Sequence, residues 1–383
     1  MKRILVLRLS ALGDVIHTIP AVTAFRDADI SWVVEAPYAE LVEIVTGVQA
    51  IPVRMKKWGR SLISSRGEMR DTLEKMRGAD VSIDFQGLVK SAMLGAFAGA
   101  KMRYGFDREA VREKASLLFT NEKVKVDTTK HVVEQNLELA RHVRVLEEGS
   151  RIPLRPPHPP SAPFDSLRSL RAGSSSPLHG GEGRSNDEHP DRLPLSRSSV
   201  DEPRTIDGHP HRDPSPPRAG EKVPKADEGV HTAANWDAFP EPIDVRPGKT
   251  VILPGAGKAN KLWPINRFRE LAARLDDPLV VWGPGEAERA QAIGARIAPP
   301  TNLRELAWLL RNAELVIGGD TGPLHLAAAL GTRVVGLYGP TNPRRNGPYG
   351  QLDHVVDESV TTKLMEAITV ESVMKVVERV SAE

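Results

Sequence analysis

The sequence predicts an α/β protein of two units, each built on a parallel sheet with helices on both faces. Short apolar runs rich in β-branched residues alternate with amphipathic segments over residues 1–150, and the same alternation resumes at residue 250. Strands that alternate with helices in this way favour doubly wound parallel sheets. The length of 383 residues agrees with two domains.

The N-terminal half carries three strand patterns and two helix patterns. Strands are predicted at 3–9 (RILVLRL), 29–35 (DISWVVE) and 78–86 (GADVSIDFQ). Helices are predicted at 39–47 (AELVEIVTG) and 91–100 (SAMLGAFAGA). We expect residues 1–152 to form the first domain.

The C-terminal half repeats this alternation with strands that run into glycine-rich turns. These strand-and-turn units lie at 249–257, 278–285, 313–320 and 333–340. Helices are predicted at 286–298 and after Asn302, which stands at capping-box spacing from Glu305. We expect residues 241–360 to form the second domain.

The last segment, residues 361–383, is predicted to contain an amphipathic helix. Its apolar residues Ile368, Val373, Val377 and Val380 recur at helical spacing. A helix with one apolar stripe buries it against other elements, so we expect this segment to dock on the rest of the chain.

The middle of the chain differs in composition from both halves. Of the 31 prolines, 15 fall between residues 153 and 224, where Phe164 is the one aromatic residue. Such a segment buries too little apolar surface to offset its ordering entropy, so residues 153–240 are predicted to be a disordered insertion and linker. On this hypothesis, deletion of residues 157–230 leaves folding and activity intact.

Composition excludes several classes of protein. The chain has no cysteine, which rules out disulfides, thiolate metal sites and cysteine nucleophiles. The apolar run near the N-terminus is too short for a signal peptide, and no run approaches the roughly 20 apolar residues of a spanning helix. We therefore expect a cytoplasmic protein. A net charge of +2 gives no indication of a nucleic-acid partner.

The stretch 316–332 (VIGGDTGPLHLAAALGT) is the strongest candidate for a binding loop. Thr321 can cap a helix, Pro323 suits its first turn, and Gly331 suits its end. The free amides and dipole of such a helix N-terminus attract a phosphate, and Asp320 and His325 stand on either side. The alternative is a well-capped helix without a ligand.

Two further loops after strands carry charged residues. Lys258 and Lys261 lie in a glycine-rich loop (LPGAGKANKLWP, 253–264) that matches neither the P-loop nor the dinucleotide fingerprint. They suit a diphosphate, and a solvated lysine pair explains them about as well. Glu286 follows the next strand, where it suits a ribose or, equally, the first turn of a helix.

In the first half, Asp14 follows the first strand within SALGDVIHTIP (10–20), where an acid either caps a helix or acts in catalysis. The cluster RMKKWGR (54–60) and the stretch SIDFQGLVKSA (82–92) suit an acidic substrate or a solvated surface. The second stretch sets Asp84, Gln86 and Lys90 near a strand end. Neither half has metal-ligand spacing.

Four of these motifs together resemble the lipopolysaccharide heptosyltransferases of glycosyltransferase family 9. They are SALGDVIHTIPA, IDFQGLVKSA, DTGPLHLAAALG and LYGPTNP, and the resemblance covers residues 1–150 and 240–383. It is strongest to the type that adds the first heptose to Kdo-lipid A. The resemblance implies a GT-B fold, in which two Rossmann-like domains face each other across a cleft, the first binding the acceptor and the second the nucleotide sugar.

The resemblance also implies a reaction: inverting transfer of heptose from ADP-L-glycero-D-manno-heptose to Kdo, with no metal or cofactor. The enzyme would work at the cytoplasmic face of the inner membrane, in peripheral contact through basic residues beside Trp58. By motif match, Asp14 is implied as the general base. The implied donor-binding residues are Lys261, Glu286, Thr301, Asp320, Thr321, Gly322 and His325. The implied acceptor-binding residues are Lys56, Lys57, Arg60 and Arg112.

One residue departs from the family pattern, since Gln135 stands where a basic acceptor contact is expected. Two other functions fit the same motifs. One is a GT-B enzyme with a different nucleotide sugar and acceptor, which a panel of nucleotide sugars would reveal. The other is a catalytically impaired nucleotide-sugar-binding protein, which would bind ADP and regain transfer when residues 157–230 are excised.

Overall fold

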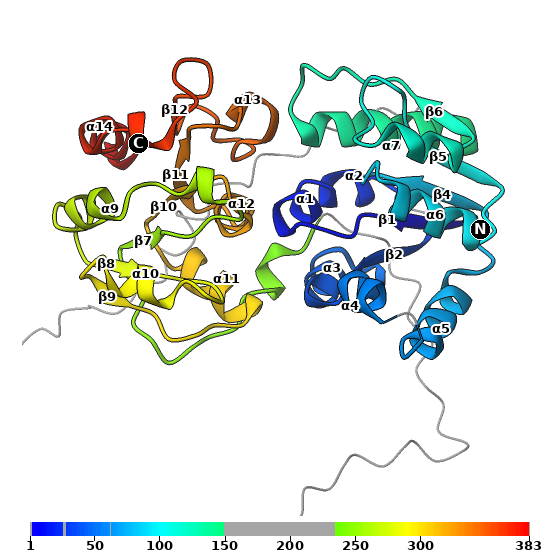
Figure 1. Cartoon of the computed structure of the whole chain (residues 1–383), viewed down its shortest axis with the longest axis horizontal. Helices are drawn as coiled ribbons and strands as arrows, with labels where there is room; N and C mark the ends of the chain where they lie inside the picture. Colours follow the sequence, from blue (N-terminus) through cyan, green and yellow to red (C-terminus); the bar gives the residue numbers. More distant parts are fainter. Residues whose placement is uncertain (1, 26–27, 62, 149–233, 383) are drawn as a thin grey trace, which may run out of the picture. The chain divides into compact units, whose positions relative to one another are not determined.

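The first sheet belongs to the N-terminal half of the chain and is drawn with its helices in Figure 1. Its strands are β1 (Arg3–Leu7), β2 (Asp29–Glu35), β3 (Gln49–Val53), β4 (Val81–Asp84), β5 (Met102–Phe106) and β6 (Glu122–Val124). They pair in parallel in the order β3-β2-β1-β4-β5-β6. The three predicted strands are confirmed as β1, β2 and β4. The sequence reading missed the other three, because Pro52, Gly105 and the short polar run at 122–124 weaken their strand patterns.

The second sheet has the same topology. Its strands are β7 (Thr250–Leu253), β8 (Pro278–Val280), β9 (Arg296–Ile297), β10 (Leu315–Gly319), β11 (Arg333–Tyr338) and β12 (Val355–Asp357). They also pair in parallel, in the order β12-β11-β10-β7-β8-β9. The four predicted strands are confirmed, and β12 is a short addition at one edge. The helix predicted at 286–298 was too long: it ends at Gln291, Gly294 turns with a φ of +80°, and β9 forms the other edge. Both sheets thus have the strand order of a dinucleotide-binding fold.

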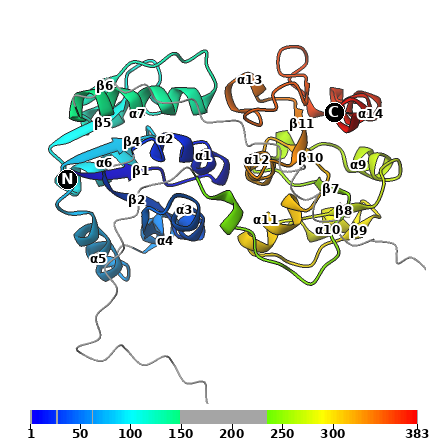
Figure 2. The ribbon, with the colours of Figure 1, turned by 180° about the vertical axis from the view of Figure 1, so that it is seen from behind.

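Helices connect successive strands in both halves (Figure 2). The first half contains α1 (Leu12–Ile16), α2 (Ile19–Val22), α3 (Ala39–Thr46), α4 (Met55–Arg60), α5 (Arg66–Met76), α6 (Val89–Phe97) and α7 (Val132–Glu148). The second contains α9 (Ile265–Ala272), α10 (Ala287–Gln291), α11 (Leu303–Arg311), α12 (Gly322–Ala329), α13 (Pro343–Asn346) and α14 (Val370–Ala382). Short 3₁₀ turns are η1 (Ala36–Tyr38), η2 (Lys114–Leu118), η3 (Trp236–Ala238), η4 (Ala259–Lys261) and η5 (Met365–Ala367). In the described part of the chain, no helix is both long and apolar enough to cross a membrane.

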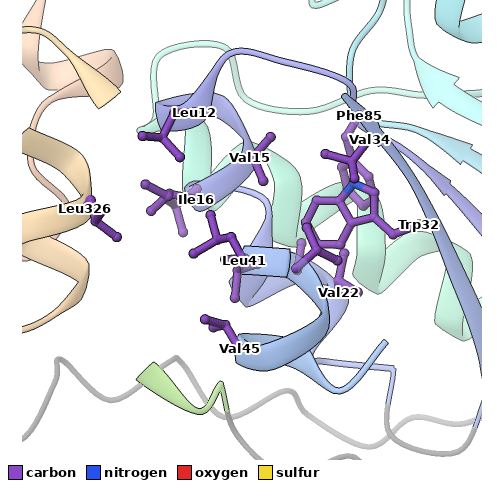
Figure 3. Close-up of a cluster of buried hydrophobic side chains, with 14 of the residues drawn as sticks. Leu12, Val15, Ile16, Val22, Trp32, Val34, Leu41, Val45, Phe85 and Leu326 are labelled. Atoms are coloured by element: carbon purple, nitrogen blue, oxygen red, sulfur yellow. The ribbon is translucent and has the colours of Figure 1, made fainter. Parts of the chain in front are cut away.

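The central strands of each sheet bury side chains on both faces, as parallel sheets covered by helices require. In β1, Ile4 and Val6 belong to one hydrophobic cluster and Leu5 and Leu7 to another. Within the first half of the chain, the first cluster draws its helical residues from α1, α2, α3 and α7, and the second from α4, α5 and α6. Figure 3 shows the indole of Trp32 within the first cluster. The period of two in the strand sequences therefore sets which helices cover which face.

Helices α1 and α12 make direct contact, which joins the cores of the two halves into one cluster. Figure 3 shows Leu326 of α12 opposite Leu12 and Ile16 of α1. Glycines permit this approach. A Cβ at Gly322 would lie 2.7 Å from the Cβ of Leu12, and one at Gly13 would lie 2.7 Å from the His325 ring. Any larger residue at either position would force the helices apart.

The structure, a computed structural model, describes residues 2–25, 28–61, 63–148 and 234–382, without the side chains of 145–148. Most of the predicted insertion therefore lies outside the described residues. Residues 234–240, at the end of the predicted insertion and linker, are described: η3 forms there, and Phe239 is fully buried. The predicted C-terminal helix is present as α14, and its four predicted apolar residues are buried.

Candidate active site

Four loops meet where each sheet reverses its strand order. In the first sheet the order turns between β1 and β4, and in the second between β7 and β10. Ligands of doubly wound sheets bind outside the carboxyl ends of the strands at such points. A pocket of about 590 Å³ lies there, a volume suited to a small-molecule ligand. Its lining includes eight predicted site residues: Asp14, Arg112, Lys261, Glu286, Asp320, Thr321, Gly322 and His325.

Asp14 is held by two arginines. Its Oδ1 lies 2.8 Å from Arg8 Nη2 and 2.9 Å from Arg112 Nη2, and Arg8 is fully buried. Burial raises the pKa of Asp14, but Arg8 and Arg112 outweigh it and lower that pKa below its usual value. The carboxylate is therefore charged at neutral pH. Among the described side chains, none donates a hydrogen bond to the other oxygen, Oδ2.

Asp14 does not occupy the cap position of α1, which falls to Ala11. It stands in the first turn of the helix, where the helix dipole favours a negative charge. The sequence left capping and catalysis as alternatives. The helix has no side-chain capping hydrogen bond among the described residues, and the Asp14 side chain lines the pocket.

The loop that carries Asp14 rests on the loop after β4. Gln86 Oε1 accepts hydrogen bonds from the amides of Leu9 and Ser10, at 2.9 and 3.2 Å. Asp84 Oδ1 in turn accepts from the amides of Gln86 and Gly87. The motif IDFQG, interpreted above as part of a substrate surface, therefore supports the Asp14 loop, and Asp84 and Gln86 themselves are buried.

Replacing Asp84 with asparagine is expected to change how stability depends on pH. Burial raises the pKa of Asp84 to about 6, from an ordinary value of 3.8, despite its hydrogen bonds. A raised folded-state pKa contributes stability below the unfolded pKa that is lost as pH rises through the folded pKa. The wild type should therefore lose stability relative to Asp84→Asn between pH 4 and pH 6, measured by urea unfolding. A difference between the two proteins that is constant over this range would contradict the prediction, and exposed Asp29→Asn serves as control.

The N-terminus of α12 forms the opposite wall of the pocket. Thr321 occupies the cap position as predicted, but its side chain makes no capping hydrogen bond. Its Oγ1 is buried and, among the described residues, has no hydrogen-bond partner. Pro323 stands in the first turn, and Gly331 ends the helix with a φ of +82°. This end of α12 thus offers free amides and a free hydroxyl to an anion.

Three side chains contact Asp320, which directly precedes the N-terminal cap of α12. Its Oδ2 lies 2.6 Å from Lys261 Nζ and 3.3 Å from Asn346 Nδ2, and its Oδ1 lies 3.1 Å from His325 Nε2. Burial raises the pKa of Asp320, but His325 and Lys261 hold it well below its usual range. Asp320 therefore fixes the Lys261 ammonium in the pocket as a charged group.

Glu286 lines the same pocket from the loop after β8. It is the cap residue of α10, and its Oε2 accepts a hydrogen bond from the Gly283 amide at 2.8 Å. The carboxylate lies so close to Gly255 that a Cβ there would be 2.0 Å from Oε1. Glu286 therefore lies at the start of a helix, which was one of the two alternatives given by the sequence, and its side chain also lines the pocket.

Several predicted site residues lie elsewhere. Thr301, Lys56, Lys57 and Arg60 are absent from the described lining of the pocket. In α4, Lys57 pairs with Glu68 at 2.9 Å. Trp58 is buried in the core, so it does not form the surface contact with a membrane that its basic neighbours suggested. Gln135 is also buried, and it donates to the Lys130 carbonyl at the start of α7 rather than to the pocket.

The sequence reading missed four polar residues of this site: Arg8, His17, Arg345 and Asn346. Arg8 lies inside a strand-like run, where it resembles an ordinary surface charge. His17 packs edge-on against His325, with ring centroids 4.5 Å apart. Arg345 and Asn346 follow β11, so their position after a strand was the available signal. In the described ranges, no group of three or more acidic or histidine side chains is arranged to hold a metal.

Comparison with known proteins identifies the family. The sequence profile of glycosyltransferase family 9 (heptosyltransferase) matches residues 69–157 and 214–373, more than half of the chain. The chain belongs to glycosyltransferase family 9. The family-level resemblance found in the sequence is thereby confirmed, and this family 9 glycosyltransferase has the predicted GT-B fold.

Named relatives extend over almost the whole of this family 9 chain. Lipopolysaccharide heptosyltransferase 1 of Escherichia coli K12 is 27% identical over 369 residues, which cover 91% of each protein. The enzyme of the same name from Pseudomonas aeruginosa is 28% identical over 91% of this chain and 82% of its own length. The structure of E. coli heptosyltransferase WaaC with ADP is 25% identical, covers 99% of both chains and superposes with a TM-score of 0.66.

Proposed function

We propose that this chain is a heptosyltransferase I of lipopolysaccharide core biosynthesis. It transfers L-glycero-D-manno-heptose from ADP-heptose to the Kdo of Kdo-lipid A, with inversion at the anomeric carbon. The observation that carries the proposal is that Asp14 and the anion-binding end of α12 line one pocket. The name of the E. coli and P. aeruginosa relatives, and the ADP in the WaaC structure, support the donor and the pathway.

Asp14 acts as the general base in this proposal. Its Oδ2 takes the proton of the acceptor hydroxyl while the hydroxyl oxygen forms a bond to the anomeric carbon of heptose. Arg8 and Arg112 hold Oδ1 and keep the carboxylate charged, so it is ready to accept a proton at neutral pH. The same arginines lower its basicity, so the proton moves when the hydroxyl has become acidic by attacking.

The second sheet provides the leaving-group site. As the bond between the anomeric carbon and the diphosphate breaks, its electron pair departs with ADP. Lys261 and the free amides of α12 stabilise this charge without any change of their own position, because Asp320 already fixes Lys261. In this proposal Glu286, which lines the pocket, accepts a hydrogen bond from the ribose, and Thr301, outside the described lining, approaches the adenosine.

The acceptor carries carboxylates and phosphates, so its binding requires cations on the first sheet. Arg112, which pairs with the general base Asp14, supplies one of these cations. Lys56, Lys57 and Arg60 are exposed on α4, away from the described pocket lining, and we propose that they meet phosphates of the lipid part of the acceptor. Because that lipid lies in a bilayer, the enzyme would work in peripheral contact with the inner membrane.

The test is transfer by the purified full-length chain from ADP-heptose to Kdo₂-lipid A, followed by mass spectrometry of the product. We expect one heptose to be added, and with the β- or α-configuration opposite to that of the donor. Parallel reactions with ADP-glucose and UDP-glucose should give no product. Transfer of another sugar in preference to heptose would replace this proposal by a GT-B enzyme of different specificity.

A second measurement separates an impaired protein from an active one. ADP binding by calorimetry without transfer of any sugar would indicate a nucleotide-sugar-binding protein. Excision of residues 157–230 would then be expected to restore transfer if the insertion is the cause. Transfer at equal rates with and without that segment would instead show that it is tolerated.

A further inference from the structure

Arg345 lines the pocket and has no polar partner in the described part of the chain. It belongs to α13, where Asn342 caps the helix through the Arg344 amide and Pro343 is buried in the first turn. The side chain lines the pocket and remains accessible to solvent. Among the described residues its guanidinium makes no hydrogen bond or ion pair, whereas Arg8 and Arg112 both contact Asp14. A well-supported cation is thus free to bind a ligand.

Arg345 lines the same pocket as Asp14 and Arg112. Burial and then Arg112 lower the pKa of Arg345, while Asp14 raises it. The next residue along α13, Asn346, donates to Asp320 on the other wall. Residues of α13 therefore line the pocket together with both Asp14 and Asp320.

We infer that Arg345 binds the carboxylate of the acceptor sugar together with Arg112. This rests on the proposed function, in which the acceptor is a sugar acid and Asp14 is the base. A guanidinium presents paired donors that match a carboxylate. Arg112 comes from the first half of the chain and Arg345 from the second, so one carboxylate held by both orients the acceptor hydroxyl on Asp14.

The stereochemistry of the reaction favours the acceptor carboxylate over the donor diphosphate as the ligand of Arg345. Inversion requires the attacking oxygen and the leaving diphosphate to lie on opposite sides of the anomeric carbon. The leaving-group side already has Lys261 and the end of α12. Arg345 lines the pocket with Asp14 and Arg112, so the anion that still lacks a cation of its own is the charged group of the acceptor.

The first arm of the test compares Arg345→Ala, Arg345→Lys and the control Arg344→Ala in the full-length chain. Arg344 is exposed on the same helix and absent from the described pocket lining. We expect Arg345→Ala to raise the acceptor KM by roughly 10-fold or more, as loss of a charged hydrogen bond does, with the donor KM within about two-fold of wild type. Arg345→Lys should restore part of the loss, and Arg344→Ala should match the wild type.

The second arm uses an acceptor whose Kdo carboxylate is converted to the neutral methyl ester. If Arg345 binds that group together with Arg112, the ester should weaken binding to the wild type by a larger factor than it weakens binding to Arg345→Ala, which keeps Arg112. An equal penalty for Arg345→Ala with acid and ester would overturn the inference, as would an increase in the donor KM alone. A wild-type chain that transfers heptose to neither acceptor would overturn the proposed function, and this inference with it.

Discussion

Asp14→Asn is expected to lower kcat by about 10²-fold or more, the usual contribution of a general base. Asparagine has the shape of aspartate and still offers an oxygen to Arg8 and Arg112, but it cannot take the proton of the acceptor hydroxyl. ADP binding, measured by calorimetry, should be unchanged because the leaving-group site lies on α12 and Lys261. Single-turnover rates with ADP-heptose and Kdo₂-lipid A measure the loss.

The choice of asparagine rather than alanine matters for this experiment. Alanine would leave the buried Arg8 guanidinium without its partner, and breaking a buried ion pair costs about 3–5 kcal/mol of stability. Asparagine keeps an oxygen for Arg8 and Arg112 but loses the charge, so Asp14→Asn should keep the wild-type circular dichroism spectrum and lower the unfolding midpoint less than Asp14→Ala does. The matched control is Asp29→Asn, which removes an exposed carboxylate at the amino end of β2. Near-normal turnover by Asp14→Asn would remove Asp14 from the role of base.

Lys261→Met is expected to lower kcat by roughly 10²- to 10³-fold, as removal of a preorganised group at a developing negative charge does. The Lys261 ammonium is held 2.6 Å from Asp320 before any ligand arrives, so it costs little reorganisation in the transition state. The substitution also leaves Asp320 with fewer partners, and the affinity for ADP should fall. Both effects are measurable by steady-state kinetics and calorimetry.

Two companion variants show whether the effect belongs to Lys261 itself. Lys249→Ala removes an exposed lysine that pairs with Asp276 on the surface, and its kinetics should match the wild type. Lys261→Arg keeps the charge but changes its shape, so it should recover part of the rate. Wild-type kcat and ADP affinity in Lys261→Met would show that the diphosphate binds elsewhere.

Local features of the site were predictable from sequence because they depend on neighbours along the chain. The capping box of Asn302 and Glu305 forms as expected, with reciprocal hydrogen bonds at 2.8 and 2.9 Å. Thr321, Pro323 and Gly331 begin and end α12 where their backbone preferences require. The two arginines on Asp14 were not predictable, since one of them is 98 residues away.

The contacts of the basic residues also could not be predicted from the sequence. Arg112 and Lys57 both read as cations suited to an acidic acceptor, yet one contacts Asp14 and the other Glu68. The charge of a residue determines which kind of group it can bind. The packing of its helix or loop determines which side chain it contacts. The same holds for Trp58, whose apolar ring packed into the core rather than onto the surface.

By itself, the sequence determined the two parallel sheets, most central strands, the glycine-rich loops after them and the family. Those properties follow from hydrophobic periodicity and turn chemistry, which act over a few residues. Only the tertiary structure decided which loops share a pocket, that Asp14 is ion-paired, and that Arg345 lines the same pocket with no polar partner among the described residues. The reason is physical: these distances depend on how α1 packs against α12, and two glycines far apart in the chain, Gly13 and Gly322, permit that contact.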